Sequence, residues 1–164
     1  MQFDLSPEHE MIVDTVRSFT EKELIPHEAL VEKGGAVPPD LVDQIRKRSL
    51  AAGLYAANMP AELGGGGRDS FGTTLVDREF GVTSYALQYI VARPSNILRA
   101  CQGDQIDEYL RPTIDGRRVD CLAMSEPDAG SDVRGMKCTA VRDGDDYVIN
   151  GVKHFISHAD LADY

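Results

Sequence analysis

The chain has few basic residues and no long apolar run. Its 164 residues include 17 lysines and arginines against 27 aspartates and glutamates, so the formal net charge is −10. Nucleic-acid-binding proteins present basic patches to the phosphate backbone, and this charge balance argues against that class. No apolar stretch approaches the roughly 20 residues that a transmembrane helix needs, so we expect no membrane span. Hydrophobic residues still make up 42% of the chain, which is enough for an ordinary core.

Cysteine is also scarce, and its spacing matches no metal site. Cys101, Cys121 and Cys138 are odd in number and lack the short spacings of metal ligands. We expect three reduced, mostly buried thiols in a cytoplasmic protein. The sequence also lacks the Gly-x-Ser-x-Gly elbow of hydrolases and the His-Glu-x-x-His pair of zinc proteases. These absences argue against two common classes of hydrolytic site.

Two glycine-rich stretches fail to match a phosphate-binding loop. Residues 64–67 are four consecutive glycines, but no strand precedes them and no Lys-Ser or Lys-Thr pair follows. Residues 130–135 have glycines at the right spacing, but Met136 stands where the phosphate-binding lysine is required. We therefore expect a flexible loop at 64–67 and no nucleotide site at 130–135.

The first part of the chain has the apolar spacing of helices. Ser6 is a suitable N-cap and Pro7 suits the first helical position, while Ile12, Val16 and Phe19 recur on one helical face. Helices are predicted over about 7–25, 40–52, 71–82 and 84–92, with shorter turns near 97–100 and 106–110.

The pattern changes after Arg118, where short apolar runs alternate with turn residues. Strands are predicted over 119–124, 137–142, 147–149 and 152–157. Residues 143–146 form a turn sequence, and Asn150-Gly151 strongly favours a hairpin because both residues tolerate positive φ. We predict an α+β fold, with an all-α helical bundle over 1–118 and antiparallel strands over 119–164.

The stretch from 122 to 132, LAMSEPDAGSD, has the most distinctive chemistry in the chain. Pro127 fixes one turn and Gly130 permits another, so a sharply shaped loop should follow a strand. Its backbone amides and the hydroxyls of Ser125 and Ser131 could face a ligand. From the residues alone, an ordinary polar loop and a ligand site fit equally well.

This loop resembles the first signature of the acyl-CoA dehydrogenases, in which a Ser or Thr precedes Glu and Gly-Ser-Asp follows a short spacer. Residues 150–157, NGVKHFIS, resemble the family's second flavin segment, Asn-Gly-x-Lys-x-Trp-Ile-Thr. Residues 60–65, PAELGG, resemble its Pro-x-Glu-x-Gly-Gly turn, and residues 103–116 resemble the helix and linker before the signature. The four matches occur in the family's order and cover nearly the whole chain.

The resemblance implies an FAD-dependent enzyme that dehydrogenates an acyl-CoA thioester between its α- and β-carbons. A proton leaves the α-carbon, and a hydride passes from the β-carbon to the flavin. Residues 1–118 would be the N-terminal helical domain, and 119–164 the beginning of the middle β-domain, an incomplete β-barrel. The resemblance further implies fatty acid metabolism, an electron-transfer flavoprotein or similar acceptor, and a homo-oligomer, dimer or tetramer. An acyl-CoA oxidase, a flavin-dependent monooxygenase and a non-catalytic binding or assembly module are the alternatives.

Motif matching also implies which residues contact the cofactor. They are Leu122, Met124, Ser125, Gly130 and Ser131 from the first segment, and Phe155, Ile156 and Ser157 from the second. Ser131 should also contact the CoA portion of the substrate. Phe155 stands where the family commonly has Trp, and Asp128 stands where Gly is usual.

The loop carboxylates have a structural role in this family. Glu126 and Asp132 are expected to bond backbone amides and shape the loop, rather than to bind a metal. The family's catalytic carboxylate comes from a later helical domain. We therefore expect no catalytic residue within the chain and a base beyond Tyr164.

Overall fold

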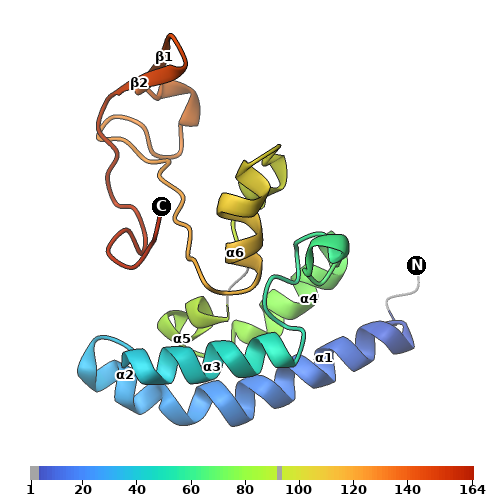
Figure 1. Cartoon of the computed structure of the whole chain (residues 1–164). Helices are drawn as coiled ribbons and strands as arrows, with labels where there is room; N and C mark the ends of the chain where they lie inside the picture. The colour runs from blue at the N-terminus through green and yellow to red at the C-terminus, as the bar shows by residue number, and fades with distance from the viewer. Residues whose placement is uncertain (1–3, 92–93) are drawn as a thin grey trace. The chain divides into compact units, whose positions relative to one another are not determined.

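The computed structural model describes residues 4–91 and 94–164. Internal contacts divide the chain into two units, Met1–Arg118 and Val119–Tyr164, called here the helical unit and the C-terminal unit. Figure 1 shows the first in blue to yellow and the second in orange to red. Residues 92 and 93, at the end of one predicted helix, lie outside the described residues. No helix in the described ranges is long and apolar enough to cross a bilayer.

The helical unit begins with α1 (Pro7–Phe19), which starts as the sequence predicts. The Ser6 Oγ accepts a hydrogen bond from the His9 N–H at 3.3 Å, and Pro7 occupies a position where no N–H donor is needed. The path continues through a π-helix, η1 (Thr20–Leu24), and a 3-10 helix, η2 (Ile25–His27). It then enters a helix that the sequence did not predict, α2 (Glu28–Gly34).

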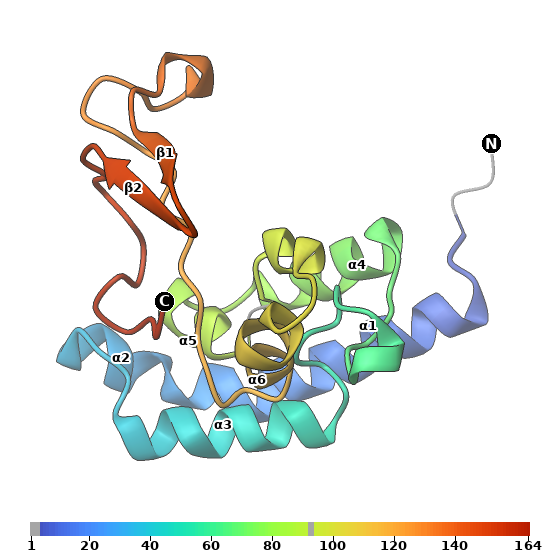
Figure 2. The same ribbon diagram turned by 45° about the horizontal axis from the view of Figure 1, so that its top comes forward.

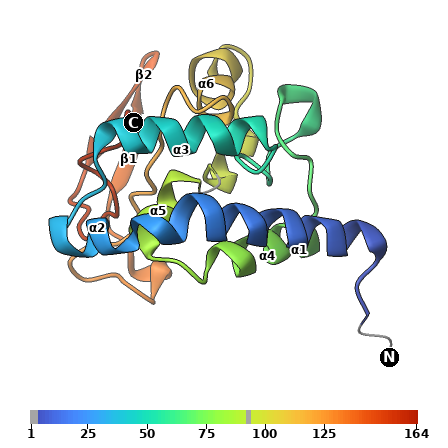
Figure 3. The same cartoon turned by 90° about the horizontal axis from the view of Figure 1, so that it is seen from below.

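The other helices of this unit overlap the predicted segments, except Ala61–Leu63 and Arg111–Ile114, which were not predicted as helices. They are α3 (Pro39–Ala51), the 3-10 turn η3 (Ala61–Leu63), α4 (Ser70–Phe80), α5 (Tyr85–Ile90), the 3-10 turn η4 (Asn96–Ala100), the π-helix η5 (Ile106–Leu110) and α6 (Arg111–Ile114). Helices α1 and α3 run alongside each other in all views, most clearly in Figure 3. The core draws most of its buried side chains from four helices. These are Ile12, Val16 and Phe19 from α1, Ile45 from α3, Val76 and Phe80 from α4, and Leu87 and Ile90 from α5. The elements η1 and α2 add Leu24 and Val31.

A partly buried ion pair joins α1 to α4. The Glu79 carboxylate on α4, only 7% exposed, accepts hydrogen bonds from Arg17 Nε on α1 at 3.0 Å and from Arg78 at 2.6 Å. Burial raises the pKa of Glu79, but the hydrogen bonds from the two guanidiniums outweigh that effect and lower the pKa below its ordinary value. Glu79 can therefore stay charged on the inner face of its helix.

The glycine run 64–67 is not the flexible loop expected from the sequence. Its backbone amides donate hydrogen bonds to the preceding residues 56–60. The N–H of Gly65 donates to Pro60 O, that of Gly66 to Ala56 O, and that of Gly67 to Met59 O, at 2.8 to 3.0 Å. A Cβ added at Gly65 would lie 2.4 Å from the carbonyl oxygen of Met59. The glycines are needed because two backbone segments pass closer together than a side chain allows.

The C-terminal unit holds one antiparallel hairpin, β1 (Thr139–Asp143) and β2 (Asp146–Asn150), seen as paired arrows in Figure 2. Val141 pairs with Val148, and Gly144 at φ +64° opens the two-residue turn. Together with the helices before it, the hairpin confirms the predicted α+β class. All ten strand residues are exposed, so neither face of the hairpin is covered within the described part of this unit.

Two of the four strand predictions are wrong. Residues 119–124 and 152–157 are loops. A strand forms only when its backbone hydrogen-bonds to a neighbouring strand, and no strand lies beside either segment in the described part of the chain. Residues 119–121 instead bond residues 163–164: the N–H of Asp163 donates to Val119 O at 2.8 Å, and that of Cys121 to Tyr164 O at 3.1 Å. For the same reason Asn150-Gly151 ends β2 and does not turn a second hairpin.

Candidate functional site

The loop 122–132 is folded back on itself by its own backbone. The N–H of Glu126 donates to Ala129 O at 2.9 Å, and the N–H of Ala129 returns a bond to Glu126 O at 3.1 Å. Pro127 and Asp128 occupy the tip of this turn, while Glu126 and Ala129 are buried at its base. Further along, the Asp132 carboxylate accepts from the N–H of Arg134 at 3.2 Å, which confirms its predicted bond to a backbone amide.

The Glu126 carboxylate links this loop to two later segments. It accepts from the backbone N–H groups of Lys137 at 2.6 Å and Cys138 at 3.0 Å, and from the Lys153 ammonium at 2.8 Å. The bond from Lys153, followed by those from Lys137 and Cys138, lowers the pKa of Glu126 to about 2. The carboxylate is therefore ionised at neutral pH. Its predicted role of bonding backbone amides and shaping the loop is confirmed.

The second family-like segment lies directly beside the first. The Lys153 ammonium also donates to the carbonyl oxygen of Met124 at 2.9 Å, and the N–H of His154 donates to the carbonyl oxygen of Ser125 at 3.0 Å. We call the bonds from Lys153 and His154 to residues 124–126 the clamp. It brings together two segments that are nearly thirty residues apart in the sequence.

Around the clamp, apolar side chains are exposed, and both segments also carry serines. Leu122, Met124 and Phe155 are exposed, and Phe155 is the most exposed of them at 88%. Phe155 has a φ of +55°, uncommon for a residue with a side chain, and its ring lies against His154 with centroids 3.8 Å apart. Exposed apolar groups beside serine hydroxyls suit a flat aromatic ligand with one polar edge.

The remaining predicted cofactor residues have mixed burial. Ser125 and Ile156 are partly buried, whereas Gly130, Ser131 and Ser157 are exposed. The clamp brings Met124 and Ser125 next to the segment that carries Phe155. Gly130 and Ser131 follow the turn at residues 126–129, and the described bonds do not tie them to the second segment.

Lys153 holds the two segments together, which the sequence pattern does not predict, although the residue belongs to the second family-like segment. The chemistry of its partner explains why a lysine is present, because a buried carboxylate such as Glu126 requires a cation or several hydrogen-bond donors beside it. The cysteine prediction also needs correction: Cys101, Cys121 and Cys138 are free but partly exposed, not mostly buried. The Sγ of Cys138 lies 3.7 Å from Val152 O, and the neighbouring Glu126 carboxylate raises the pKa of this thiol.

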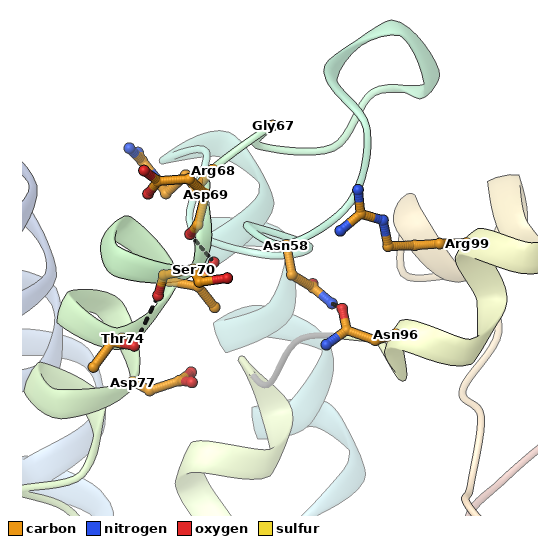
Figure 4. A pocket seen from close by; sticks show the side chains of 10 residues that line it. Asn58, Gly67, Arg68, Asp69, Ser70, Thr74, Asp77, Asn96 and Arg99 are labelled. Atoms are coloured by element: carbon orange, nitrogen blue, oxygen red, sulfur yellow. Dashed lines mark hydrogen bonds between the residues drawn. The ribbon is translucent and has the colours of Figure 1, made fainter.

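A polar pocket of about 520 Å³ lies within the helical unit (Figure 4). It is lined by Asn58, Gly67, Arg68, Asp69, Ser70, Thr73, Thr74, Asp77, Asn96 and Arg99. Several of these side chains already form hydrogen bonds within the protein. Asp69 accepts from the N–H of Gly72 at 2.7 Å, and Asn58 donates to Pro94 O at 2.9 Å. The two arginines and two aspartates of the lining balance in formal charge, and none of the predicted cofactor residues lines the pocket.

The described ranges offer no metal site either. No group of three or more His, Cys, Asp or Glu side chains in them is arranged to hold an ion. The loop and the clamp of the C-terminal unit therefore form the candidate site.

Comparison with protein families finds two consecutive matches. Residues 6–117 match the family model "Acyl-CoA dehydrogenase, N-terminal domain" and residues 121–164 match "Acyl-CoA dehydrogenase, middle domain". Together they cover almost all of the sequence.

Known relatives agree with these matches. The chain is 36% identical over 165 residues to the caffeyl-CoA reductase-Etf complex subunit CarC of Acetobacterium woodii, covering 96% of the chain and 42% of that protein. It is 32% identical over 161 residues to the human mitochondrial short-chain specific acyl-CoA dehydrogenase, covering 95% and 38%. The chain thus spans about four tenths of the length of these relatives.

Solved structures share the fold. A probable acyl-CoA dehydrogenase from Mycobacterium abscessus matches with a TM-score of 0.80 and 33% identity, over 96% of this chain and 43% of that one. The FAD complex of PigA matches with a TM-score of 0.84 over 99% and 43%, and at 24% identity this is a likeness of fold alone.

Proposed function

Because the chain belongs to the acyl-CoA dehydrogenase family, we propose that it is part of an FAD-dependent enzyme that dehydrogenates an acyl-CoA thioester between its α- and β-carbons. Residues 1–118 correspond to the family's N-terminal helical domain and 119–164 to the beginning of its middle β-domain. The observation that carries the proposal is the clamp, because it joins the two family-like segments through Met124, Ser125 and Glu126.

The residues around the clamp fit a flavin. Met124, Phe155 and Ile156 offer apolar surface for the isoalloxazine ring, with Leu122 and Gly130 lining the loop beside them. The hydroxyls of Ser125 and Ser157 and nearby amides would bond the polar edge of the ring, where negative charge develops on reduction. Ser131 would contact both the cofactor and the CoA portion of the substrate. When bound, FAD supplies the two-electron acceptor for the hydride that leaves the β-carbon.

The carboxylates near the loop are poorly suited to act as the catalytic base. Glu126 is buried, holds three donors and has a pKa of about 2, so it has little tendency to take a proton near neutral pH. Asp128 is paired with Lys137 at 2.8 Å, and Asp132 bonds the N–H of Arg134. As the family resemblance implies, we assign abstraction of the α-proton to a carboxylate of a later helical domain.

The proposal extends to partners and location. The name of one relative includes an Etf complex, which supports an electron-transfer flavoprotein or a similar acceptor as the partner. The three free cysteines fit a reducing compartment such as the cytoplasm. A role in fatty acid metabolism and a homo-oligomeric full-length enzyme follow from the family assignment.

Nuclear magnetic resonance on the isotope-labelled chain tests the cofactor site. Adding FAD should shift the amide resonances of residues 122–131 and 153–157 in a saturable manner. The amides of Asp69, Ser70, Thr73, Thr74 and Asp77, which line the pocket in the helical unit, serve as the internal control and should not shift. If no resonance moves, or if the shifts are confined to the pocket, the proposed flavin site is wrong.

A further inference from the structure

The Lys153 ammonium holds residues 124 and 126 at the same time. Its Nζ lies 2.9 Å from the carbonyl oxygen of Met124 and 2.8 Å from Glu126 Oε1. Between these two bonds, the N–H of His154 reaches the carbonyl oxygen of Ser125 at 3.0 Å. Three consecutive residues of the first segment are thus bonded by two consecutive residues of the second.

These three hydrogen bonds restrict the rotation of the two segments relative to each other as well as the distance between them. A single hydrogen bond from His154 to Ser125 fixes a distance, but the two segments could still turn about it. The two bonds from Lys153 reach the residues immediately before and after Ser125, and three contacts to consecutive residues restrict the relative orientation more than one contact does. An ammonium suits this role because it carries three donors on a flexible stem and can serve two acceptors at once.

The pairing with Glu126 is sheltered from solvent. The side chain of Lys153 is 28% exposed and that of Glu126 is 5% exposed. A carboxylate that loses a cationic partner in such a place must be stabilised by its remaining donors, here the N–H groups of Lys137 and Cys138. Those two donors belong to the start of the hairpin and do not reach the second segment, so they cannot replace the clamp.

We propose that Lys153 is a positioning residue for the flavin site, which sets the spacing and orientation of residues 124–125 relative to residues 155–157. The inference rests on the proposed function, because both segments are assigned to the flavin there. It gives Lys153 a role through Met124 and Glu126, not through direct contact with the cofactor.

The chain offers a matched control in Lys137. Its ammonium pairs with Asp128 at 2.8 Å in the same loop, but the two side chains are 75% and 70% exposed. Exposed pairs of this kind contribute little. Lys137→Met removes the same charge from the same region, keeps the backbone N–H that bonds Glu126, and leaves the clamp intact.

The test compares Lys153→Met, Lys153→Arg and Lys137→Met with the unaltered 164-residue chain. Lys153→Met should weaken FAD binding about 10- to 100-fold, the range expected for loss of a charge-assisted hydrogen bond. It should also speed exchange of the His154 amide proton in the absence of FAD and change the absorption spectrum of bound flavin. Lys153→Arg should restore most of the affinity, because its guanidinium can reach both acceptors. Lys137→Met should stay within about twofold of the unaltered chain.

Each outcome separates the positioning role from the proposed function. FAD binding by the unaltered chain reports on the proposed function; its absence would contradict that function and the inference with it. If the unaltered chain and Lys153→Met bind FAD equally well, with identical flavin spectra, the positioning role is wrong while the flavin site stands. Should Lys153→Met unfold the hairpin, Lys153→Gln replaces it. This neutral side chain keeps amide N–H donors but carries no charge, and an affinity equal to that of the unaltered chain would again overturn the inference.

Discussion

The carboxylate of Glu126 accepts hydrogen bonds from three groups on two later segments, and its pKa is lowered to about 2 from an ordinary value of 4.5. A lowered carboxyl pKa contributes stability that is fully present above the ordinary value and is lost as the pH falls toward the folded-state value. The loop should therefore keep its shape through mildly acidic conditions and loosen only at strongly acidic pH.

We predict that the amide resonances of Lys137 and Cys138 report this titration directly, since both N–H groups donate to Glu126. In the unaltered chain they should shift with a midpoint near pH 2. In Glu126→Gln that shift should disappear, whereas Asp145→Asn, which changes an exposed turn carboxylate, should retain it. A midpoint near 4.5 in the unaltered chain would contradict the assigned role of Glu126.

Ser125 allows the cofactor contact to be tested without disturbing the clamp. Its backbone carbonyl accepts from His154, so Ser125→Ala removes only the hydroxyl. One neutral hydrogen bond contributes about 0.5–1.5 kcal/mol, so FAD affinity should fall roughly 2- to 12-fold with no change in thermal stability. Ser70→Ala, in the helical unit, is the matched control for a titration followed by flavin fluorescence. Equal affinity in both variants would mean that the Ser125 hydroxyl does not contact the flavin.

Among the elements of the helical unit, the turn at 60–67 should tolerate a small change poorly. Gly65→Ala places a Cβ 2.4 Å from Met59 O, so one of two backbone segments must move. Overpacking of this kind costs about 1–3 kcal/mol, and we expect that loss in urea unfolding of the chain. Gly34→Ala is the control, because a Cβ there meets nothing within 4 Å and its φ is ordinary. Equal stability of the two variants would show that the turn can relax.

The hairpin should be less protected than the helices. A two-stranded sheet is marginally stable by itself, and all of its residues are exposed here. We predict that amides 139–150 exchange with deuterium much faster than those of the core-facing positions of α1 in dilute solution. If exchange slows as the chain concentration rises, the strand edges pair between chains. Slow exchange at every concentration, with a monomer in sedimentation, would contradict this expectation.

The elements differ in how well the sequence predicted them. Helix α1 has a capping serine, a first-turn proline and an apolar stripe, and each of these was found as predicted. Helix α2 was missed because Val31 is its one buried residue in the described structure, so no stripe was visible. The strands at 119–124 and 152–157 were wrong because strand propensity is local, whereas pairing depends on a neighbour. The role of the glycine run depends on close approach to Met59, which is a tertiary property.

On the scale of the whole molecule, family-like motifs located the candidate site, but tertiary contacts revealed how it is held together. The two segments were recognisable as sequence. The bond from Lys153 to Met124 O involves a backbone carbonyl, which no residue pattern marks. Motif matching could also name Phe155 but not its positive φ, which depends on the path of the chain around it.

The chain by itself should not oxidise acyl-CoA. Its loop carboxylates are committed to hydrogen bonds or ion pairs, and removal of an α-proton needs a base within hydrogen-bonding reach of that proton. Purified 1–164 should therefore show no turnover with added FAD, several acyl-CoAs and an artificial electron acceptor. A full-length member of the family is the positive control. Turnover above the flavin blank would place a working base within the chain.

The pairing of Val141 with Val148 has a consequence for how the two strands stay aligned. Sliding one strand by a single residue would exchange its two faces, which is costly only when one face is buried. Here both faces are exposed, so burial does not oppose such a slip. Alignment then depends on the turn at Gly144, whose φ of +64° favours the two-residue connection. A change at Gly144 would cost the hairpin its alignment rather than its packing, and the loss of contacts between Val141 and Val148 in a nuclear Overhauser spectrum would reveal it.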